Sequence, residues 1–285
     1  MSAISLPTRR FSPARLAAFR AVETACRWAG GRAFYRARFL SPPRLRVRRE
    51  RVEIAGLAAE LDGLAIAQLS DFHGGPFLRA RDLARVIDAT NALEPDVVAL
   101  TGDFATHHAD EAIEIAPAFG ALRPRVGAFA VLGNHDYKRR RDGEIARALE
   151  AQRVRVLRNE HVAAAPGLAI AGIEDLEEGK PSDLDAALAG VDARATVVLL
   201  SHHPGGAGFA SRRGVALVLS GHTHGGQIQW PLLRRLGPPH PGDRLRVGGT
   251  TLLVSHGVGA VGVPFRSGSR AEIVLATLAR APRAD

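Results

Sequence analysis

Short apolar segments alternate with amphipathic segments along most of the chain. The apolar segments are typical of buried strands and lie at residues 64–70, 96–101, 127–132, 168–172, 196–201 and 215–220. Between them, apolar residues recur at helical spacing, which predicts helices at 79–93, 110–122, 140–152 and 182–189. Beyond residue 225 the helical pattern stops, and further strands are expected at 250–255 and 272–278. This alternation predicts an α/β fold.

The N-terminal segment has a different pattern. Ser12 followed by Pro13 is typical of a helix start, and Pro42-Pro43 is expected to end the helical segment 12–39. The apolar residues of this segment share one side of the helix: Leu16, Phe19, Val22 and Cys26. Such a basic amphipathic helix can lie on an anionic membrane, or it can pack its apolar side on the rest of the protein. We therefore divide the chain into a basic amphipathic arm, residues 1–43, and a main domain, residues 44–280.

Charge distinguishes the arm from the main domain. The 285-residue chain has a net charge of +9. Its first 50 residues hold twelve arginines and only two acidic residues, Glu23 and Glu50, so they carry +10 and leave −1 for the other 235 residues. Nucleic-acid binding by the main domain is disfavoured, because such binding depends on clustered basic residues. Peripheral contact of residues 9–49 with an anionic membrane is consistent with this distribution.

Few features indicate a cellular location. Cys26 is the single cysteine, which excludes an internal disulfide. No segment has the roughly 18 consecutive apolar residues of a membrane span. The motif Thr8-Arg9-Arg10-Phe11 is similar to a twin-arginine export signal, but Arg15 and Arg20 interrupt the apolar run that should follow it. We expect a cytoplasmic protein or one peripheral to the inner membrane, not one exported by the twin-arginine route.

Polar residues with metal-binding side chains follow the ends of the predicted strands. They lie in five motifs: Asp71-Phe72-His73, Gly102-Asp103, Gly133-Asn134-His135-Asp136, Ser201-His202 and Gly221-His222-Thr223-His224. Open α/β sheets gather ligands at the carboxyl ends of their strands. The donors are too many for one metal ion and suit two, and their mixture of imidazole, carboxylate and amide groups is typical of Mn, Fe, Zn or Co. Because a two-metal site activates water and binds phosphoryl oxygens, the chain is predicted to be a phosphoesterase.

In this order the motifs resemble those of the calcineurin-like metallophosphoesterase superfamily over residues 60–280. Ser201-His202-His203-Pro204, residues 221–227 and Val263-Pro264-Phe265-Arg266 resemble its bacterial YkuE-like branch. The resemblance implies a four-layer α-β-β-α sandwich of two mixed sheets. It also implies two divalent metal ions with seven ligands: Asp71, His73 and His224 for the first ion, Asn134, His202 and His222 for the second, and Asp103 as the bridge.

The resemblance also implies how the other residues of the motifs would act. A metal-bridging hydroxide would hydrolyse a phosphomonoester, a phosphodiester or a pyrophosphate. His135 would be the catalytic residue that stabilises the developing charge or protonates the leaving oxygen. Asp136 and His203 are candidate substrate contacts. Protein phosphatases of the superfamily carry an aspartate at the position of Thr106, so activity on phosphoproteins is not expected.

The nature of the substrate has three interpretations. The basic arm favours a membrane-associated or cell-envelope substrate, such as a lipid-linked phosphoester. A soluble cyclic nucleotide or dinucleotide is the alternative for the same chemistry. A non-catalytic metal-binding scaffold is an alternative of another class, but function is inferred from the site, and none of the motif residues is replaced.

Overall fold

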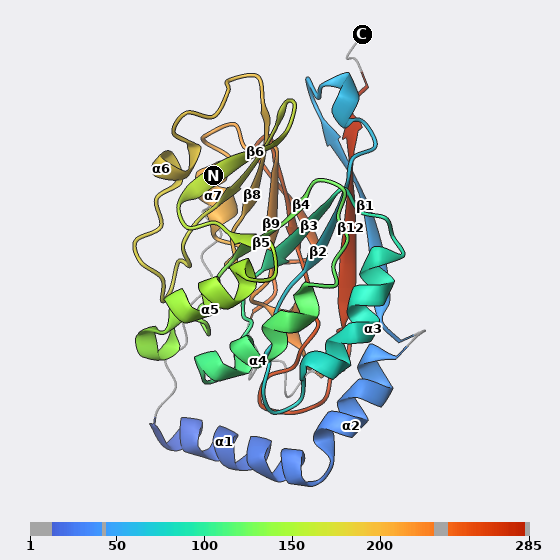
Figure 1. Ribbon diagram of the computed structural model, residues 1–285, viewed down its shortest axis with the longest axis vertical. Helices are drawn as coiled ribbons and strands as arrows, with labels where there is room; N and C mark the ends of the chain where they lie inside the picture. The colour runs from blue at the N-terminus through green and yellow to red at the C-terminus, as the bar shows by residue number, and fades with distance from the viewer. Residues whose placement is uncertain (1–12, 42–43, 231–238, 283–285) are drawn as a thin grey trace.

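The computed structural model describes residues 13–41, 44–230 and 239–282. Two six-stranded mixed sheets form its centre (Figure 1). The first contains, in order across the sheet, β1 (Arg46–Ile54), β12 (Glu272–Arg280), β2 (Ala65–Leu69), β3 (Val97–Thr101), β4 (Gly127–Val131) and β5 (Val154–Val156). The second contains β10 (Arg244–Val247), β11 (Thr250–Val254), β9 (Leu217–Ser220), β8 (Thr196–Leu200), β7 (Leu168–Gly172) and β6 (Glu160–Ala165).

Most strands are parallel to their neighbours, which places their carboxyl ends at one edge. Strands β2, β3, β4 and β5 run in parallel, as do β11, β9, β8 and β7. Strand β12 is antiparallel to β2, β6 to β7 and β10 to β11. Both sheets are therefore mixed.

The space between the two sheets is filled by apolar side chains from both. Ile66 and Val97 from the first sheet belong to the same buried cluster as Val198 and Leu217 from the second. The central strands are apolar on both of their faces because each sheet is covered on both sides. This burial accounts for the continuous apolar segments of the sequence.

Helices form the two outer layers. On the first sheet lie α3 (Ala80–Asn91), α4 (Ala109–Phe119) and α5 (Asp142–Glu150), and on the second lie α6 (Leu184–Leu188) and α7 (Gly206–Ala210). Residues of these helices pack on the outer faces of the sheets in two further buried clusters. The expected four-layer α-β-β-α sandwich is confirmed.

The arm is not the single helix that the sequence pattern predicts. It consists of α1 (Pro13–Trp28), α2 (Gly31–Tyr35) and a π-helical turn, η1 (Arg36–Leu40). The chain turns at Gly30, whose φ of 81° is a conformation that glycine adopts without strain. The remaining helical ends of this prediction, Ser12 and Pro42-Pro43, lie outside the described residues.

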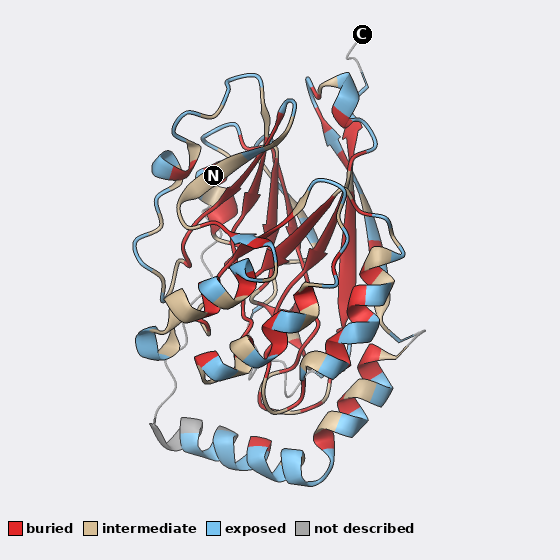
Figure 2. Cartoon of the chain, viewed as in Figure 1, coloured by how far each residue is buried: buried red, intermediate tan, exposed pale blue. Residues whose placement is uncertain are grey.

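The two ends of the arm differ in burial. Most described side chains of α1 are exposed, whereas Tyr35, Phe39 and Leu40 are buried among residues that cover the first sheet (Figure 2). Among the side chains of α1 that the structure describes, Glu23 is buried, and it accepts a hydrogen bond from His107 at 2.7 Å. The arm therefore contacts the main domain at its C-terminal end and at Glu23.

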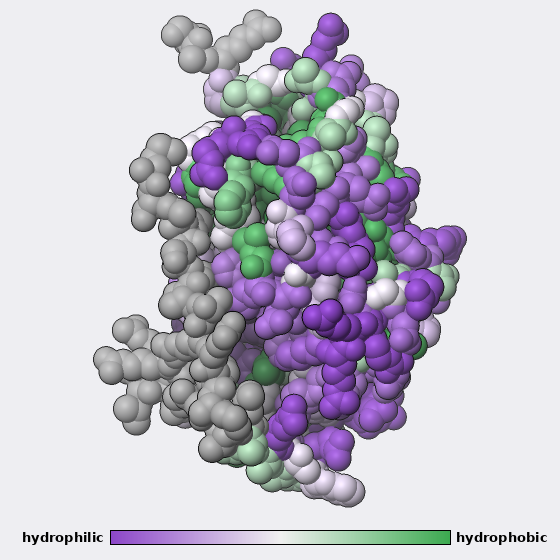
Figure 3. All heavy atoms as spheres, turned by 90° about the vertical axis from the view of Figure 1, so that its left-hand side faces the viewer, coloured by the Kyte–Doolittle hydropathy of each residue, from purple (hydrophilic) through white to green (hydrophobic). Residues whose placement is uncertain are grey.

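Two features of the structure concern membranes: the hydropathy of its surface and the character of its helices. Figure 3 shows a face on which hydrophilic residues predominate and hydrophobic residues form small separate areas. Among the described residues, no helix combines the length and apolar character needed to cross a bilayer.

Candidate metal centre

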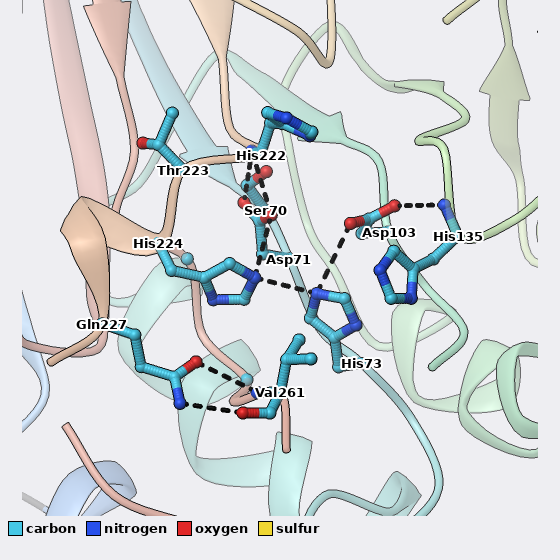
Figure 4. A network of polar contacts seen from close by, with 12 residues as sticks. Ser70, Asp71, His73, Asp103, His135, His222, Thr223, His224, Gln227 and Val261 are labelled. Atoms are coloured by element: carbon cyan, nitrogen blue, oxygen red, sulfur yellow. Dashed lines mark hydrogen bonds and ion pairs between the residues drawn. The ribbon is translucent and has the colours of Figure 1, made fainter. Parts of the chain in front are cut away.

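The motif residues come together at the carboxyl edge of both sheets. Asp71 follows β2, Asp103 follows β3 and Asn134 follows β4, all in the first sheet. His202 follows β8 and His222 follows β9, in the second sheet. Figure 4 shows several of these side chains pointing toward one another between the two sheets.

One group of donors surrounds His73. Its Nε2 atom lies 2.9 Å from Nε2 of His224 and 3.4 Å from Oδ2 of Asp103. Nε2 of His224 lies 3.5 Å from Oδ1 of Asp71. Three of these side chains, Asp71, His73 and His224, have ligand atoms close enough to share one ion.

A second group lies on the other side of Asp103. The same Oδ2 atom of Asp103 is 3.3 Å from Nε2 of His202. Oδ1 of Asn134 lies 3.3 Å from Nδ1 of His222. Oδ2 of Asp103 thus faces both groups, which is the position expected of a bridging carboxylate.

The backbone at these positions is strained. Eleven non-glycine residues of the described chain have a positive φ, and five of them are motif residues: Asp71, His73, Asp103, His222 and His224. Left-handed backbone at residues other than glycine is uncommon, and it concentrates at functional sites where the surrounding structure enforces it. The strained backbone indicates that the surrounding fold holds these side chains in fixed directions.

Close packing at the centre requires glycine beside Asp103. Gly102 has a φ of 88°, and a Cβ atom there would lie 2.6 Å from the backbone nitrogen of Gly133 and 2.7 Å from Nδ1 of His202. Any larger residue would displace the loops that carry Asp103 and Asn134. The glycine is therefore required by the close approach of three loops.

The protonation pattern of His202 fits a metal ligand. Its Nδ1 lies 2.7 Å from the carbonyl oxygen of Thr101, so this nitrogen carries the proton and donates it. Its Nε2 is buried and has no hydrogen-bond partner among the described residues. A hydrogen bond from the other ring nitrogen to a carbonyl is the usual arrangement of a histidine that binds a metal. The residues present therefore fit a metal ion at this position.

The electrostatics of the centre favour a cation. Burial by itself would raise the pKa of Asp103, but His202, His135 and His73 hold it well below its usual value. Burial lowers the pKa values of His73 and His224 well below normal, so both imidazoles are neutral donors. Burial would also lower the pKa of His202, yet Asp103 and other nearby carboxylates raise it well above normal. These carboxylates would attract a cation to the same point.

His135 lies beside the centre. Its Nδ1 atom is directed away from the ligand groups. Its Nδ1 lies 2.7 Å from the carbonyl oxygen of Thr106 and 2.7 Å from Nζ of Lys138. The backbone of Thr106 therefore positions the ring, in place of an aspartate side chain at that position. Burial, opposed by Asp103 and assisted by Lys138, lowers the pKa of His135 to about 4.

The two candidate substrate contacts differ in their surroundings. Asp136 is fully buried, and its two oxygens accept hydrogen bonds from the backbone nitrogens of Ala105 and Gly133, each at 2.9 Å. This geometry favours a role for Asp136 in bracing two loops, and its contact with a substrate stays a prediction. His203 lies at the rim, with Nε2 3.9 Å from Oε1 of Glu177, and it remains a candidate contact.

Three residues near the centre carry no signal in the sequence motifs. Lys138 touches His135, as described, and Glu177 lies 3.9 Å from Nε2 of His222. Asp175 is buried, and one of its oxygens has no partner among the described residues. Lys138 lies three residues after His135, and this short distance along the chain could have suggested it. Asp175 and Glu177 lie in the loop after β7, whose sequence is typical of an ordinary acidic turn.

A buried arginine joins the centre to the arm. Nη1 of Arg266 lies 3.3 Å from the backbone oxygen of His224, and its Nε lies 3.0 Å from the hydroxyl oxygen of Tyr35. The Tyr35 hydroxyl also contacts the carbonyl oxygens of Val258 and Gly259 at 2.7 Å. The backbone nitrogen of Gly259 in turn donates to the carbonyl oxygen of Asp71 at 2.7 Å. The arm thus supports two of the motif loops.

Comparison with known proteins agrees with this geometry. A family model described as calcineurin-like phosphoesterase matches residues 64–226. The uncharacterized metallophosphoesterase YkuE of Bacillus subtilis is 30% identical over 273 residues, which cover 91% of this chain and 94% of that protein. An uncharacterized metallophosphoesterase of Aquifex aeolicus is 33% identical over 243 residues, covering 82% and 92% of the two chains.

Animal relatives are longer. A Danio rerio protein named transmembrane protein with metallophosphoesterase domain is 33% identical over 247 residues, covering 81% of this chain. The chain spans about half of the length of that relative, 56%. The family model covers the strands that carry the motifs, and YkuE matches nearly end to end. The chain belongs to the calcineurin-like phosphoesterase family.

Proposed function

We propose that the chain is a phosphoesterase with a dinuclear metal centre, which hydrolyses a phosphomonoester, a phosphodiester or a pyrophosphate. The observation that carries the proposal is the position of Asp103 Oδ2, 3.4 Å from Nε2 of His73 and 3.3 Å from Nε2 of His202. One carboxylate oxygen between two groups of neutral and anionic donors suits a pair of cations better than a single one.

The ligands would divide between the two ions at Asp103. Asp71, His73 and His224 would hold the first, and Asn134, His202 and His222 the second, with Mn, Fe, Zn or Co as the candidate metals. When bound, the pair supplies a nucleophile derived from water near neutral pH and positive charge for the phosphoryl oxygens. The strained loops would hold the donors in place before the ions bind.

His135 would act on the reacting phosphoryl group. Its Nδ1 faces the carbonyl oxygen of Thr106 and Nζ of Lys138, so Nε2 is the nitrogen that can reach a substrate. With Lys138 donating to Nδ1, the proton of the neutral ring would lie on Nε2, which would donate a hydrogen bond to the phosphoryl group or to the leaving oxygen. Lys138, whose Nζ lies 2.7 Å from Nδ1 of His135, would add positive charge on the same side.

Substitution of the ligands tests this proposal. Purified protein loaded with Mn²⁺ should hydrolyse a bis-aryl phosphate, and Asn134→Ala and His222→Ala should each lose most of the turnover and most of one metal ion. His161→Ala is a matched control, because His161 contacts only the carbonyl oxygen of Ala187 on the far side of the second sheet. Full turnover in both ligand variants would refute the assigned site. A wild-type protein that binds the metal ions and hydrolyses no phosphoester would favour the non-catalytic metal-binding scaffold.

We also propose that the substrate lies in or at a membrane, and that residues 1–43 act as an arm which brings the catalytic domain, residues 44–280, to it. Three large hydrophobic residues of the arm are exposed: Val22, Phe34 and, at 80%, Trp28. Tryptophan is typical of membrane interfaces, where its amphipathic ring lies at the level of the headgroups. The arm contacts the loop of His107, four residues after Asp103, so a membrane that it touched would lie near the centre.

A basic recess supports a contact with phosphate headgroups. It has a volume of about 360 Å³, and it is lined by Trp28 and by five arginines: Arg27, Arg32, Arg36, Arg79 and Arg81. Arg36 pairs with Asp82 and Arg79 with Glu114. The structure gives the other three arginines no acidic partner within its described ranges, so their charge is available to an anion.

Reversing the charge of arginines in the recess distinguishes a membrane-associated substrate from a soluble nucleotide. Arg32→Glu with Arg81→Glu should weaken binding to phosphatidylglycerol vesicles about 10-fold or more, since each basic residue near an anionic surface contributes about 1 kcal/mol. Hydrolysis of a vesicle-borne substrate should fall in parallel, with turnover of a soluble diester unchanged. Arg153→Glu with Arg194→Glu changes the net charge equally at exposed positions away from the recess. Equal vesicle binding by both double variants would favour the soluble substrate.

A further inference from the structure

A second cluster of imidazole and carboxylate groups lies beside the metal centre and shares no side chain with it. His240 and Asp243 precede β10, and His256 follows β11. Nε2 of His240 lies 2.9 Å from Oδ1 of Asp243, and Nε2 of His256 lies 2.7 Å from the same oxygen. The two imidazole rings are nearly perpendicular, at 87°, with centroids 5.3 Å apart. Three donors from two loops thus converge on one point.

The outer nitrogens of both rings face hydroxyl groups. Nδ1 of His240 lies 2.8 Å from Oγ1 of Thr223, and Nδ1 of His256 lies 3.5 Å from Oγ of Ser269. Ser269 donates its own proton to the backbone oxygen of His224, at 2.6 Å. Its oxygen also accepts from Nη1 of Arg266 at 3.0 Å. A proton on Nδ1 of His256, directed at the same oxygen, would leave the lone pair on Nε2 of that ring.

A lone pair on Nε2 of His256 cannot rest 2.7 Å from a carboxylate oxygen without a positive charge between them. Two charges could satisfy this arrangement: a proton on the ring, or a metal ion bound to the ring and the carboxylate. Two ligand atoms of a tetrahedral zinc ion, each about 2.1 Å from it, are about 3.4 Å apart. The contacts of 2.7 and 2.9 Å are shorter than this value, so the two rings would move slightly away from Asp243 when an ion binds.

The cluster is open to solvent on one side. The side chain of His256 is buried and that of His240 is 15% exposed, whereas Asp243 is 36% exposed and opens the cluster to solvent. Arg46 approaches Oδ2 of Asp243, at 4.0 Å, and not the oxygen shared by the histidines. Hydrogen bonds from the two histidines hold the pKa of Asp243 below its usual value, so its carboxylate is charged.

The positive charge of the buried Arg48, beside Asp243, is already balanced. Arg48 donates from Nη1 to the backbone oxygen of Asp243 at 3.3 Å. Its guanidinium pairs with Glu50 at 2.7 Å and with Glu272 at 3.2 Å. The charge of Arg48 is thereby offset by carboxylates, and it does not exclude a cation from the far side of Asp243.

We propose that His240, Asp243 and His256 form a third cation site, selective for Zn²⁺ or a similar divalent transition metal and separate from the dinuclear centre. Two imidazoles and one carboxylate are a ligand set that these ions use, with the remaining positions filled by water. The hydroxyl groups of Thr223 and Ser269 orient the two rings from behind, as the outer partners of ligating histidines do.

The third ion would stabilise the turn that carries two motif histidines. Thr223 lies between His222 and His224 and contacts His240. The ring of His256 packs against the same turn, since a Cβ atom at Gly225 would lie 2.6 Å from it. An ion bound at the third site would therefore make this turn more rigid and would take no part in the reaction.

Metal counting on the full chain tests the proposal. Protein stripped with a chelator and titrated with Zn²⁺ alone should bind one equivalent more than the His240→Gln/His256→Gln double variant. The extra equivalent should persist in an Asn134→Ala/His222→Ala background, because that background removes ligands of the dinuclear centre only. His161→Gln is the matched control and should retain the wild-type stoichiometry.

The alternative is a proton shared between the rings and Asp243. In that case the double variant would bind as much Zn²⁺ as the wild type, and the proposal would be overturned. If the double variant does not fold, Asp243→Asn keeps the shape of the side chain, removes the charged ligand, and should show the same loss of one equivalent. An unchanged stoichiometry in Asp243→Asn would equally overturn it. Both readouts are independent of hydrolysis, so they hold even if the proposed activity is absent.

Discussion

At the scale of single residues, several side chains of the centre are positioned by a backbone conformation that is unfavourable in free energy. A left-handed φ at a non-glycine residue costs about 1 kcal/mol or more. Five motif residues have one, and each follows a strand of the carboxyl edge or lies in a turn beyond it. The sequence shows which residue types are present but not their φ, so this strain could not be predicted from it.

His135 provides the clearest prediction at this scale. We expect His135→Gln to lower kcat by about 10²- to 10⁴-fold, the range for loss of a general acid or base, because His135 is the group proposed to act on the leaving oxygen. The metal content should stay at the wild-type value, since His135 is not among the proposed ligands. Steady-state kinetics on a bis-aryl phosphate and metal analysis of the same sample measure both. A loss of metal in this variant would make His135 a ligand instead.

The sequence motifs indicate the proposed donors because five different blocks follow the order seen in the family, but they give no signal for the residues that belong to no block. Lys138 contacts His135 only because the chain turns through a short 3-10 helix, η3 (Lys138–Arg140), directly after the motif. Glu177 reaches His222 from a loop of the second sheet. Such contacts depend on loop geometry, which a pattern of residue types does not determine.

At the scale of elements, the central strands were predictable and the edge strands were not. Strands β2, β3, β4, β7 and β8 lie within one or two residues of the predicted ranges, because both of their faces are buried and their apolar runs are continuous. Strand β1 contains four arginines and two glutamates, and only alternate residues such as Val52 and Ile54 are buried. Its position at the edge of the first sheet, paired only with β12, explains why an apolar run is absent.

Tyr35 anchors the arm, and its substitution tests how firmly. We expect Tyr35→Phe to lower the free energy of unfolding by about 1–2 kcal/mol at pH 8, because a buried carbonyl loses its donor and Arg266 loses an acceptor. Burial raises the pKa of Tyr35, and Arg266 only partly opposes this. Denaturant unfolding of both proteins would measure the difference.

The pH dependence of this difference has a definite sign. A tyrosine whose folded pKa is raised contributes its full stability below the ordinary pKa of about 10, and the contribution falls as the pH rises further. The advantage of the wild type over Tyr35→Phe should therefore shrink between pH 9 and 11. A difference that grew with pH would show that the folded protein stabilises the ionised phenol, contrary to the direction given by its burial.

At the scale of the whole molecule, the two sheets meet at the metal centre. Asp71, Asp103 and Asn134 belong to the first sheet, and His202 and His222 to the second. The four-layer architecture could be predicted from the family resemblance, while the alternation of elements alone indicated only an α/β fold. The path of the arm over the first sheet could not be predicted, since it depends on Tyr35 reaching residues more than 200 positions away.

Removal of the metal ions should destabilise the entire fold. An ion at about 100 times its dissociation constant contributes about 2.7 kcal/mol per site, which corresponds to roughly 5–10 °C in Tm for a protein of this size. Calorimetry with and without a chelator measures the shift, and Mn²⁺ should restore it. The Asn134→Ala/His222→Ala variant should respond much less. Identical responses of the two proteins would place the stabilising ions elsewhere.

The origin of the donors in two sheets has a mechanical consequence. Bound ions would link the two sheets at one end, while the apolar interface holds them together along their length. An enlarged side chain deep in that interface, far from any donor, would push the sheets apart and weaken the binding of the ions. Resistance to chelators would then report on packing at the opposite end of the protein.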